Sequence, residues 1–444
     1  MPLELTPISS IPKIVANVQA TFLSHRTQSL EFRKEQLRAL QRMMSENEDE
    51  VTEAIKSDLN RSKDFEIPSI IATCEDYINN LEKLTEDRKA VGQKENDNCY
   101  TRLSPLISAA YKFLLEMNHV AFGLALEPLA GALAAGNVAI VKPSEVSENS
   151  ARVMAQLFKK YMDPGVVSVI NGGVEETTTL LQQRFDHIFY TGSTEVAKVV
   201  MAAAAKHLTP VTLELGGKCP VIITEHTDLA DAAKKIAFWK TLNSGQVCVT
   251  ADYILCPKHL QGELIQNVIG TWKHLFGEDA MASKKLPKIV TKRQHERLER
   301  LLEKAKTRNT IAFGGRTDED TLLVEPTIVK DVSPDDEIMR DEIFGPILPI
   351  VTYDIFDHAL DIIGKYELPL ALYLFSDKKE QVDQLLRETR SGAFVVNDIG
   401  SHYMNETLPF GGVGHSGMGN YHGKFSIDTF SHHRAVLIRT QDGL

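Results

Sequence analysis

The stretch DHIFYTGSTEVAKVVMAAAAKHL, residues 186–208, decides the fold, because it joins a buried strand directly to a helix. Its first part, DHIFYTGS, is a short apolar run that ends in a turn signal, and its second part, TEVAKVVMAAAAKHL, has a helical composition. The same order occurs twice upstream, with NVAIVKP before SENSARVMAQLFKKYM and VVSVINGG before EETTTLLQQRF. Repeated strand–turn–helix units of this size predict a parallel sheet covered by helices.

The rest of the chain extends this pattern. PVIIT, which follows LELGGK, starts the same alternation of strands and helices again, so a second α/β domain is expected to begin near residue 214. Residues 28–60 are predicted to be helical, since apolar residues recur there every three or four positions and Ser45 with Glu48 matches a capping box. The polar stretch 86–102 breaks the periodicity, which predicts a loop or an extended arm.

Length and composition exclude several classes of protein. The 444 residues predict two or three domains, and 43% hydrophobic with 25% charged residues is typical of a globular protein. A net charge of −11 argues against a nucleic-acid partner. We find neither an apolar run of the roughly 18 residues that a membrane helix needs nor a signal-peptide pattern at the N-terminus. Five cysteines without CxxC spacing predict no disulfide framework and no metal site, and a cytoplasmic location is expected.

Two glycine-containing motifs could bind a dinucleotide. GVGHSG, residues 412–417, matches G-x-G-x-x-G, but only 27 residues follow it and it lies in a loop with six glycines. We therefore reject it as a phosphate site and expect backbone packed closely around a site or a partner. YTGSTE places Gly192 and Ser193 at a strand-to-helix junction, a position that suits pyrophosphate. Lys142 in VKPSE ends another strand in the same way, where parallel sheets bind ligands.

The stretch SGQVCV, residues 244–249, raises the question of catalysis. Cys248 lies between two valines, and a free cysteine in such a setting usually packs as a small hydrophobic residue. The alternative is a nucleophile, which depends on thiol reactivity rather than on burial. The residues around Cys248 do not by themselves distinguish the two interpretations.

Taken in order, the runs VKPSE, FYTGS, VTLELGGKCPVII, SGQVCV, EIFGPILPI, NDIGSH and LPFGGVGHSGMGNYHGKFSIDTFSHHRAVL resemble the aldehyde dehydrogenase superfamily, most of all its class 3 branch, which includes fatty aldehyde dehydrogenases. The resemblance is close over residues 122–440 and looser over 1–85. It implies an α/β, aldehyde dehydrogenase-like fold with two parallel-sheet α/β domains and a small oligomerisation arm. The expected dinucleotide-binding domain comprises 1–85 and 107–213, the catalytic domain 214–400, and the arm and C-terminal segment 86–106 and 401–444.

The resemblance also implies roles for particular residues. Cys248 corresponds to the nucleophile that attacks the aldehyde carbonyl, and Glu214 corresponds to the general base that activates water for thioester hydrolysis. Taken without the resemblance, Glu214 would be interpreted as a strand-end carboxylate in a salt bridge. The resemblance also implies residues that bind NAD or NADP. Glu342 and Phe344 would contact the nicotinamide riboside, Lys142 and Glu145 the adenosine, and Gly192 and Ser193 the pyrophosphate. Cys219 and Cys256 are interpreted as packing residues, and His432 and His433 as surface residues.

The stretch 103–121 departs from the family pattern. The family has an asparagine there whose side chain forms the oxyanion hole with the backbone N–H of the nucleophile. Aligned without gaps from Phe122, His119 takes that position and Asn118 stands one residue early, and a one-residue slip turns a strand side chain to the opposite face. Asn118 and His119 therefore stay as alternative donors. AAYKFLLEM, residues 109–117, resembles a helix more than an inner strand, through real divergence or an error at an exon boundary.

Three functions follow as hypotheses. The first is NAD(P)-dependent oxidation of aldehydes, of medium or long aliphatic chains by the branch resemblance, to carboxylic acids. The second is a non-catalytic relative that binds a nucleotide or a partner, which the unusual 103–121 segment suggests. The third is an enzyme that releases acyl-CoA, although Glu214 argues for hydrolysis. The branch further implies a homodimer. From the sequence itself, no integral membrane segment is expected, and peripheral membrane association stays an open alternative.

Overall fold

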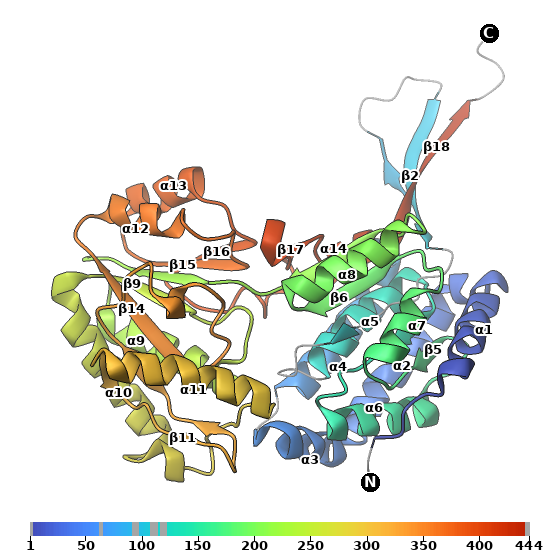
Figure 1. Cartoon of the computed structure of the whole chain (residues 1–444). Coiled ribbons are helices and arrows are strands. Elements are labelled where there is room, and N and C mark those ends of the chain that lie inside the picture. The colour runs from blue at the N-terminus through green and yellow to red at the C-terminus, as the bar shows by residue number, and fades with distance from the viewer. Residues whose placement is uncertain (1–2, 62–64, 91–96, 107–113, 116–121, 440–444) are drawn as a thin grey trace.

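The computed structural model describes residues 3–61, 65–90, 97–106, 114–115 and 122–439. It has two lobes, each with helices packed on a sheet, and an antiparallel arm that extends away from one of them (Figure 1). The predicted α/β class with parallel sheets is confirmed.

The first lobe contains the strand–helix repeats from which the fold was predicted. Strand β6 (Ile188–Gly192) pairs in parallel with β7 (Val211–Leu215), and the sheet order is β17-β7-β6-β3, with β17 spanning Gly417–Met418. A separate parallel pair is formed by β4 (Ala139–Val141) and β5 (Val167–Val169). The helices of these repeats are α6 (Glu148–Tyr161), α7 (Val174–Leu181) and α8 (Thr194–Ala205).

Five earlier helices complete this lobe: α1 (Ile11–Leu23), α2 (Leu30–Ser45), α3 (Glu48–Leu59), α4 (Glu66–Leu84) and α5 (Gly123–Ala135). The helices expected over 28–60 are thus present as α2 and α3. The predicted capping box is wrong, because Ser45 is the last residue of α2 and Asn47 is the N-cap of α3. A sharp break between two helices can place the pattern on the end of the first helix instead of the start of the second.

The second lobe is built on a seven-stranded sheet of order β10-β13-β14-β9-β8-β15-β16, parallel except for β10. Its strands are β8 (Pro220–Ile223), β9 (Tyr253–Pro257), β10 (Ile311–Phe313), β13 (Thr327–Val329), β14 (Ile347–Tyr353), β15 (Ala371–Phe375) and β16 (Ala393–Val396). Its helices are α9 (Leu229–Thr241), α10 (Gln261–Phe276), α11 (Lys292–Thr307), α12 (Phe356–Ile363) and α13 (Lys379–Glu388). A small hairpin of β11 (Thr317–Asp318) and β12 (Leu323–Val324) lies beside them.

The arm is a long antiparallel pair, β2 (Asp97–Pro105) with β18 (Ser431–Arg439), to which β1 (Arg88–Lys89) adds a third strand. Strand β18 directly follows α14 (Gly423–Thr429) in the chain, so the C-terminal segment packs on the first lobe before it enters the arm (Figure 1). The polar stretch 86–102 lies largely in this arm. No helix in the described part of the chain is long and apolar enough to cross a membrane.

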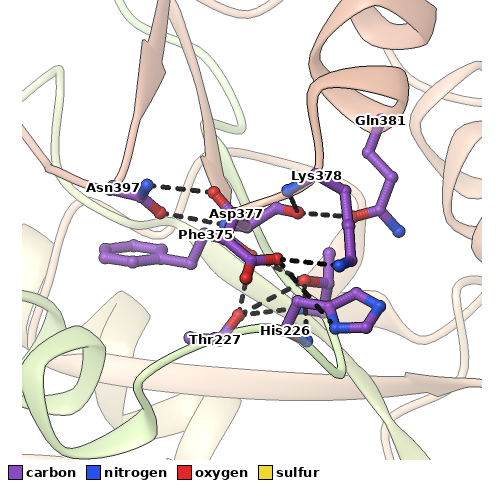
Figure 2. Close-up of polar contacts among 9 residues, drawn as sticks. His226, Thr227, Phe375, Asp377, Lys378, Gln381 and Asn397 are labelled. Atoms are coloured by element: carbon purple, nitrogen blue, oxygen red, sulfur yellow. Dashed lines mark hydrogen bonds and ion pairs between the residues drawn. The ribbon is translucent and has the colours of Figure 1, made fainter.

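The carboxyl ends of β8 and β15 are tied together by side chains (Figure 2). The hydroxyls of Thr224 and Thr227 donate to the carbonyl of Phe375 at 2.9 and 2.6 Å. The Asn397 amide, just after β16, accepts from the Ser376 N–H and donates to the Ser376 carbonyl, both at 2.9 Å. These bonds hold in place the start of the segment that returns from the second lobe to the first.

One expectation about secondary structure is corrected. Within AAYKFLLEM, Leu114 and Leu115 form strand β3, which pairs in parallel with Tyr190 and Thr191 of β6. Pairing with an existing sheet edge here outweighs helix propensity, which is a weak preference. Asn118 and its alternative His119 lie outside the described residues.

Candidate active site

Cys248 lies on a tight loop between α9 and β9. The loop passes through the short helix η3 (Leu242–Gly245), in which Asn243, Ser244 and Gly245 all have left-handed φ angles of 54°, 56° and 70°. A side chain at Gly245 would come within 2.3 Å of the Gly345 carbonyl oxygen, so glycine is required there. This compact turn lets the backbone reverse and presents Cys248, which is 9% exposed, at the end of the loop.

Cys248 lines a cavity of about 250 Å³ between the two lobes. The first lobe and the C-terminal segment contribute Phe65, Leu124, Tyr403 and Met404 to its wall, and the second lobe contributes Phe238, Trp239, Leu242, Asn243, Val247 and Val249. Nearly all of these side chains are apolar. The cavity therefore suits an apolar ligand whose reactive end reaches a sulfur atom.

Glu214 is the fourth residue of β7 and is 3% exposed. It lies between Thr191 of β6 and Gly417 of β17, and among the described residues neither of its carboxylate oxygens has a hydrogen-bond partner. The salt bridge that would have made it a structural carboxylate is thus not found in the described part of the chain. Burial raises the pKa of Glu214 well above its usual value. A buried carboxyl with a raised pKa can exchange a proton with a bound molecule.

Glu342 belongs to the loop 341–346, and its carboxyl lies on the glycine pair that follows β7. A Cβ atom at Gly216 would come within 2.1 Å of the Glu342 Oε2 atom. Burial, and then the negative charge of Asp252, raises the pKa of Glu342 to about 8, although the Gly217 N–H bonds the carboxylate. Phe344 of the same loop has a left-handed φ of 46°. The glycines after β7 are therefore needed so that Glu342 can approach the backbone beside Glu214.

A buried ion pair that our sequence interpretation missed joins three loops. Lys218 donates to Asp252 Oδ2 at 2.5 Å, and Asp252 Oδ1 accepts from the Ile343 N–H at 2.8 Å. Lys218 follows the glycine pair, Asp252 follows the Cys248 loop, and Ile343 lies next to Glu342. Arg297 of α11 also donates to the carbonyls of Glu342 and Ile343. These contacts bring Glu214, Cys248 and Glu342 to one place.

The electrostatic surroundings keep Cys248 neutral in the free protein. Burial raises the pKa of the Cys248 thiol, and the negative charges of Glu342 and Glu214 raise it further. The Cys219 thiol donates to the Cys248 carbonyl at 3.3 Å and is itself fully buried. Cys248 thus lies within the electrostatic influence of two carboxyl groups, whereas Cys219 packs behind the loop as expected.

Lys142 and Glu145, just after β4, contact each other directly. The Lys142 ammonium group donates to Glu145 Oε2 at 2.9 Å and to the Pro143 carbonyl at 3.1 Å. Lys142 is 1% exposed, whereas the Glu145 side chain is 39% exposed. Within the described residues β4 pairs with β5 and not with β6 or β7, and neither Lys142 nor Glu145 lines the cavity at Cys248.

Gly192 ends β6, and Ser193 is the N-cap of α8, where its hydroxyl accepts from the Val196 N–H at 3.4 Å. Gly192 pairs with Leu215, so the start of α8 lies at the same sheet edge as Glu214. The N-terminus of this 12-residue helix carries partial positive charge that favours an anion.

The glycine-rich loop packs backbone against backbone, as expected. A side chain at Gly412 would come within 2.0 Å of the Ser416 carbonyl oxygen, and one at Gly417 within 2.3 Å of the Leu213 carbonyl oxygen. The loop therefore closes against β7 directly opposite Glu214.

Several lining residues of the cavity gave no signal in the sequence. Phe65, Phe238 and Tyr403 are ordinary aromatic residues within unrelated helices and loops, 338 positions apart from first to last. A pattern that is local in sequence cannot show that they meet.

Comparisons with known proteins complete this description. The model of the aldehyde dehydrogenase family matches residues 7–436. Aldehyde dehydrogenase family 3 member A2 of Rattus norvegicus is 45% identical over 438 residues, which cover 97% of this chain and 88% of that protein. The aldehyde dehydrogenase, dimeric NADP-preferring, of Rattus norvegicus is 42% identical and covers 98% of this chain and 95% of its own length. The solved substrate-bound state of Staphylococcus aureus AldH has a TM-score of 0.93 at 37% identity, covering 97% of this chain and 94% of that one.

Proposed function

The chain belongs to the aldehyde dehydrogenase family and is an oxidoreductase that acts on aldehydes, and we propose that its reaction runs through Cys248 in the cavity between the lobes. The observation that carries this proposal is the buried Cys248 thiol in the cavity wall, within electrostatic reach of the Glu214 carboxyl, whose oxygens have no hydrogen-bond partner among the described residues. Family membership supports the function, and the roles of individual residues are proposed from the family resemblance together with the geometry.

In the proposed reaction, Cys248 Sγ forms a bond to the aldehyde carbon, and its proton leaves to a neighbouring base. The product of this step is a tetrahedral thiohemiacetal. After oxidation to the thioester, Glu214 takes a proton from water, the water oxygen attacks the thioester carbon, and the carbon–sulfur bond breaks to release the carboxylic acid. Glu214 must first have lost its own proton, and the raised pKa then suits this work, because the carboxylate formed is a stronger base than an exposed one.

The oxyanion of the tetrahedral intermediate needs hydrogen-bond donors. We propose the backbone N–H of Cys248 as one of them. Asn118 stays a prediction for the other, with His119 as the alternative. Loss of one such donor typically lowers turnover by about 100- to 1,000-fold.

The cofactor is NAD or NADP, as in the relative whose name calls it NADP-preferring. The residues present fit it: Glu342 offers a carboxylate to ribose hydroxyls from its glycine cradle, and the start of α8 at Ser193 offers N–H groups to pyrophosphate. When bound, the cofactor supplies the hydride acceptor for the oxidation step. Lys142 and Glu145 are proposed adenosine contacts, and Gly192 and Phe344 are proposed to shape the pyrophosphate and nicotinamide ends.

We propose medium- or long-chain aliphatic aldehydes as substrates. The cavity wall is almost entirely apolar, and Phe238 and Met404 continue it to the surface with 49% and 55% of their area exposed. Each methylene buried against this wall contributes about 0.8 kcal/mol. KM should therefore fall about fourfold for each added methylene until the chain fills the cavity.

The non-catalytic alternative is not favoured, because the relatives are aldehyde dehydrogenases and Cys248, Glu214 and Glu342 are all present. Release of acyl-CoA would need a thiol co-substrate in place of water. It is distinguished by whether turnover requires added coenzyme A.

We further propose a homodimer that forms through the arm, β2 with β18. The relative with 42% identity is named dimeric, and Leu437 and Ile438 of the edge strand β18 are 55% and 50% exposed. The expected domain boundaries and the cytoplasmic location, with peripheral membrane association as its alternative, stay predictions.

The test follows the absorbance of reduced cofactor with purified protein, octanal or hexadecanal, and NAD⁺ or NADP⁺, without coenzyme A. Turnover should vanish in Cys248→Ala and persist in Cys256→Ala, a buried thiol on β9 outside the cavity. Turnover that survives in Cys248→Ala would contradict the assignment of the nucleophile.

A further inference from the structure

Glu127 is a buried carboxyl group that the reaction described above does not use. It lies on α5 with 4% of its surface exposed. Its Oε1 accepts from the Ser69 hydroxyl at 2.6 Å, and its Oε2 accepts from the Tyr403 hydroxyl at 2.8 Å. Both carboxylate oxygens are thus held by hydroxyl donors from other parts of the chain.

These two bonds join three elements that form the cavity wall. Ser69 belongs to α4, whose N-cap Phe65 lines the cavity. Leu124 lies one helical turn before Glu127 on α5 and lines the cavity as well. Tyr403 is itself a lining residue of the C-terminal segment. Glu127 therefore lies directly behind the part of the wall that the first lobe and this segment provide.

The hydroxyl of Tyr403 is joined to α5 by its hydrogen bond to Glu127. Its ring packs edge-on against Phe410 at 5.1 Å and against His422 at 5.3 Å between centroids. Such contacts fix the plane of the ring, but the hydroxyl still needs a partner because a buried O–H without one costs free energy. The position of the wall at Tyr403 is thus coupled to the state of the Glu127 carboxyl.

We propose that Glu127 is a positioning residue for aldehyde binding, which as a carboxylate holds Tyr403 against the cavity and on protonation holds it less tightly, so that affinity for long aldehydes falls in acid. This inference rests on the proposed reaction at Cys248. It adds a pH-dependent control of substrate affinity at that same site.

The surroundings of Glu127 place its ionisation near neutral pH. Burial raises its pKa to about 7, against the lowering effect of the bonds from Ser69 and Tyr403. The negative charges of Glu406 and Glu66 raise it as well. Further titratable groups near Glu127 or its helix, among the described residues, include the Cys74 thiol of α4, the Tyr421 hydroxyl, and Arg33 of α2, which bonds the Ala134 carbonyl at the far end of α5.

The chemistry of the two states differs at Tyr403. A carboxylate accepts from both hydroxyls at once, as the structure shows. A protonated carboxyl carries a hydrogen on one oxygen, which then acts as a donor. The hydroxyl that faces this oxygen must then accept instead of donate, and the other hydroxyl donates to a neutral carbonyl oxygen. Both bonds lose the strength that the carboxylate charge gives them, which loosens the link between α5 and the C-terminal segment.

The test measures KM and kcat for octanal and propanal between about pH 6 and pH 8.5, a range that spans the pKa of Glu127. Both aldehydes react at Cys248, so the ratio of their KM values cancels the pH dependence of the chemistry. In the parent protein the KM for octanal divided by the KM for propanal should rise about fivefold on acidification. This change corresponds to the free energy of about one net hydrogen bond. The kcat values of the two aldehydes should keep a constant ratio.

Variants separate positioning from folding. In Glu127→Gln the ratio should become independent of pH, because the amide has no proton to gain. In Ser69→Ala the midpoint should move to higher pH, because the lost hydroxyl lowered the pKa of Glu127. Glu176→Gln, a buried carboxyl on α7 that bonds the Gly173 N–H, is the matched control and should keep the parent's pH dependence.

The outcomes distinguish this inference from the proposed function. A flat ratio in the parent protein, or an unchanged pH dependence in Glu127→Gln, overturns the role of Glu127 while turnover stands. The second measurement is calorimetric binding of octanal to Cys248→Ala at about pH 6 and about pH 8, on either side of the pKa. Binding that weakens in acid without any turnover in the parent would support Glu127 and refute the proposed reaction, and equal binding at both pH values would refute Glu127.

Discussion

Replacing Glu214 by glutamine gives a direct test of whether this carboxyl is held for chemistry at the expense of stability. The side chain is 3% exposed, and neither oxygen has a hydrogen-bond partner among the described residues, so none of these residues would compensate a negative charge on it by a hydrogen bond. Glutamine has nearly the same shape and cannot ionise. The substitution therefore removes the charge while it leaves the packing in place.

The magnitude follows from proton linkage. Burial raises the pKa of Glu214 in the folded chain, whereas in the unfolded chain the group ionises near its usual value of 4.5. Between these two pKa values the folded state keeps a proton that the unfolded state has lost, so the free energy of unfolding falls as pH rises. The slope is about 1.4 kcal/mol per pH unit for one such group. Glu214→Gln should lack this contribution and become progressively more stable than the parent as pH rises above 4.5.

The assay is urea unfolding followed by the fluorescence of Trp239 and Trp272, at pH values that increase stepwise from the usual pKa of the group, 4.5. The difference between parent and variant isolates Glu214, since all other groups titrate in both. Glu176→Gln controls for the amide substitution itself. Parallel stability curves for the parent and Glu214→Gln would refute the conclusion that Glu214 is buried as a neutral acid.

The same variant tests the catalytic role. Without a base for water, kcat should fall about 100- to 10,000-fold, while the first turnover still releases reduced cofactor as a burst. Unchanged steady-state turnover would show that another group, such as Glu342, activates water.

Two further substitutions test the framework of the site. Gly216→Ala places a methyl group 2.1 Å from Glu342 Oε2, so the carboxylate must move. KM for the cofactor should then rise at least about tenfold, which corresponds to the loss of one hydrogen bond to a charged group. An unchanged KM would exclude Glu342 as a cofactor contact. Arg61→Met removes the partner of the buried Glu66 carboxylate, which also accepts from the N–H groups of Phe122 and Gly123, and should cost about 3–5 kcal/mol in urea unfolding. A loss below about 1 kcal/mol, as for an exposed ion pair, would contradict that account.

The order of strands and helices was predictable from the sequence, whereas the side chains that line the cavity were not. The alternation of strands and helices over 137–208 was predictable because each element carries its own signal within a few residues. The strand at Leu114 and Leu115 was not, because its pairing with β6 depends on a partner 76 positions away. Cys248 and Glu214 were identified through the family resemblance, whereas the side chains that line the cavity were not.

The amino-acid sequence by itself determined the class of fold, the order of its elements and the family, because hydrophobic periodicity and short motifs are local properties of the chain. Only the tertiary structure decided which residues meet. The buried Lys218–Asp252 pair joins the loops of Glu214, Cys248 and Glu342, and it leaves the Glu214 carboxyl without a partner. The bond of Glu127 to Tyr403 spans 276 positions and closes one wall of the cavity. Such contacts depend on the burial of polar groups far apart in the chain, and a polar group buried away from water must find its partner wherever the fold places one.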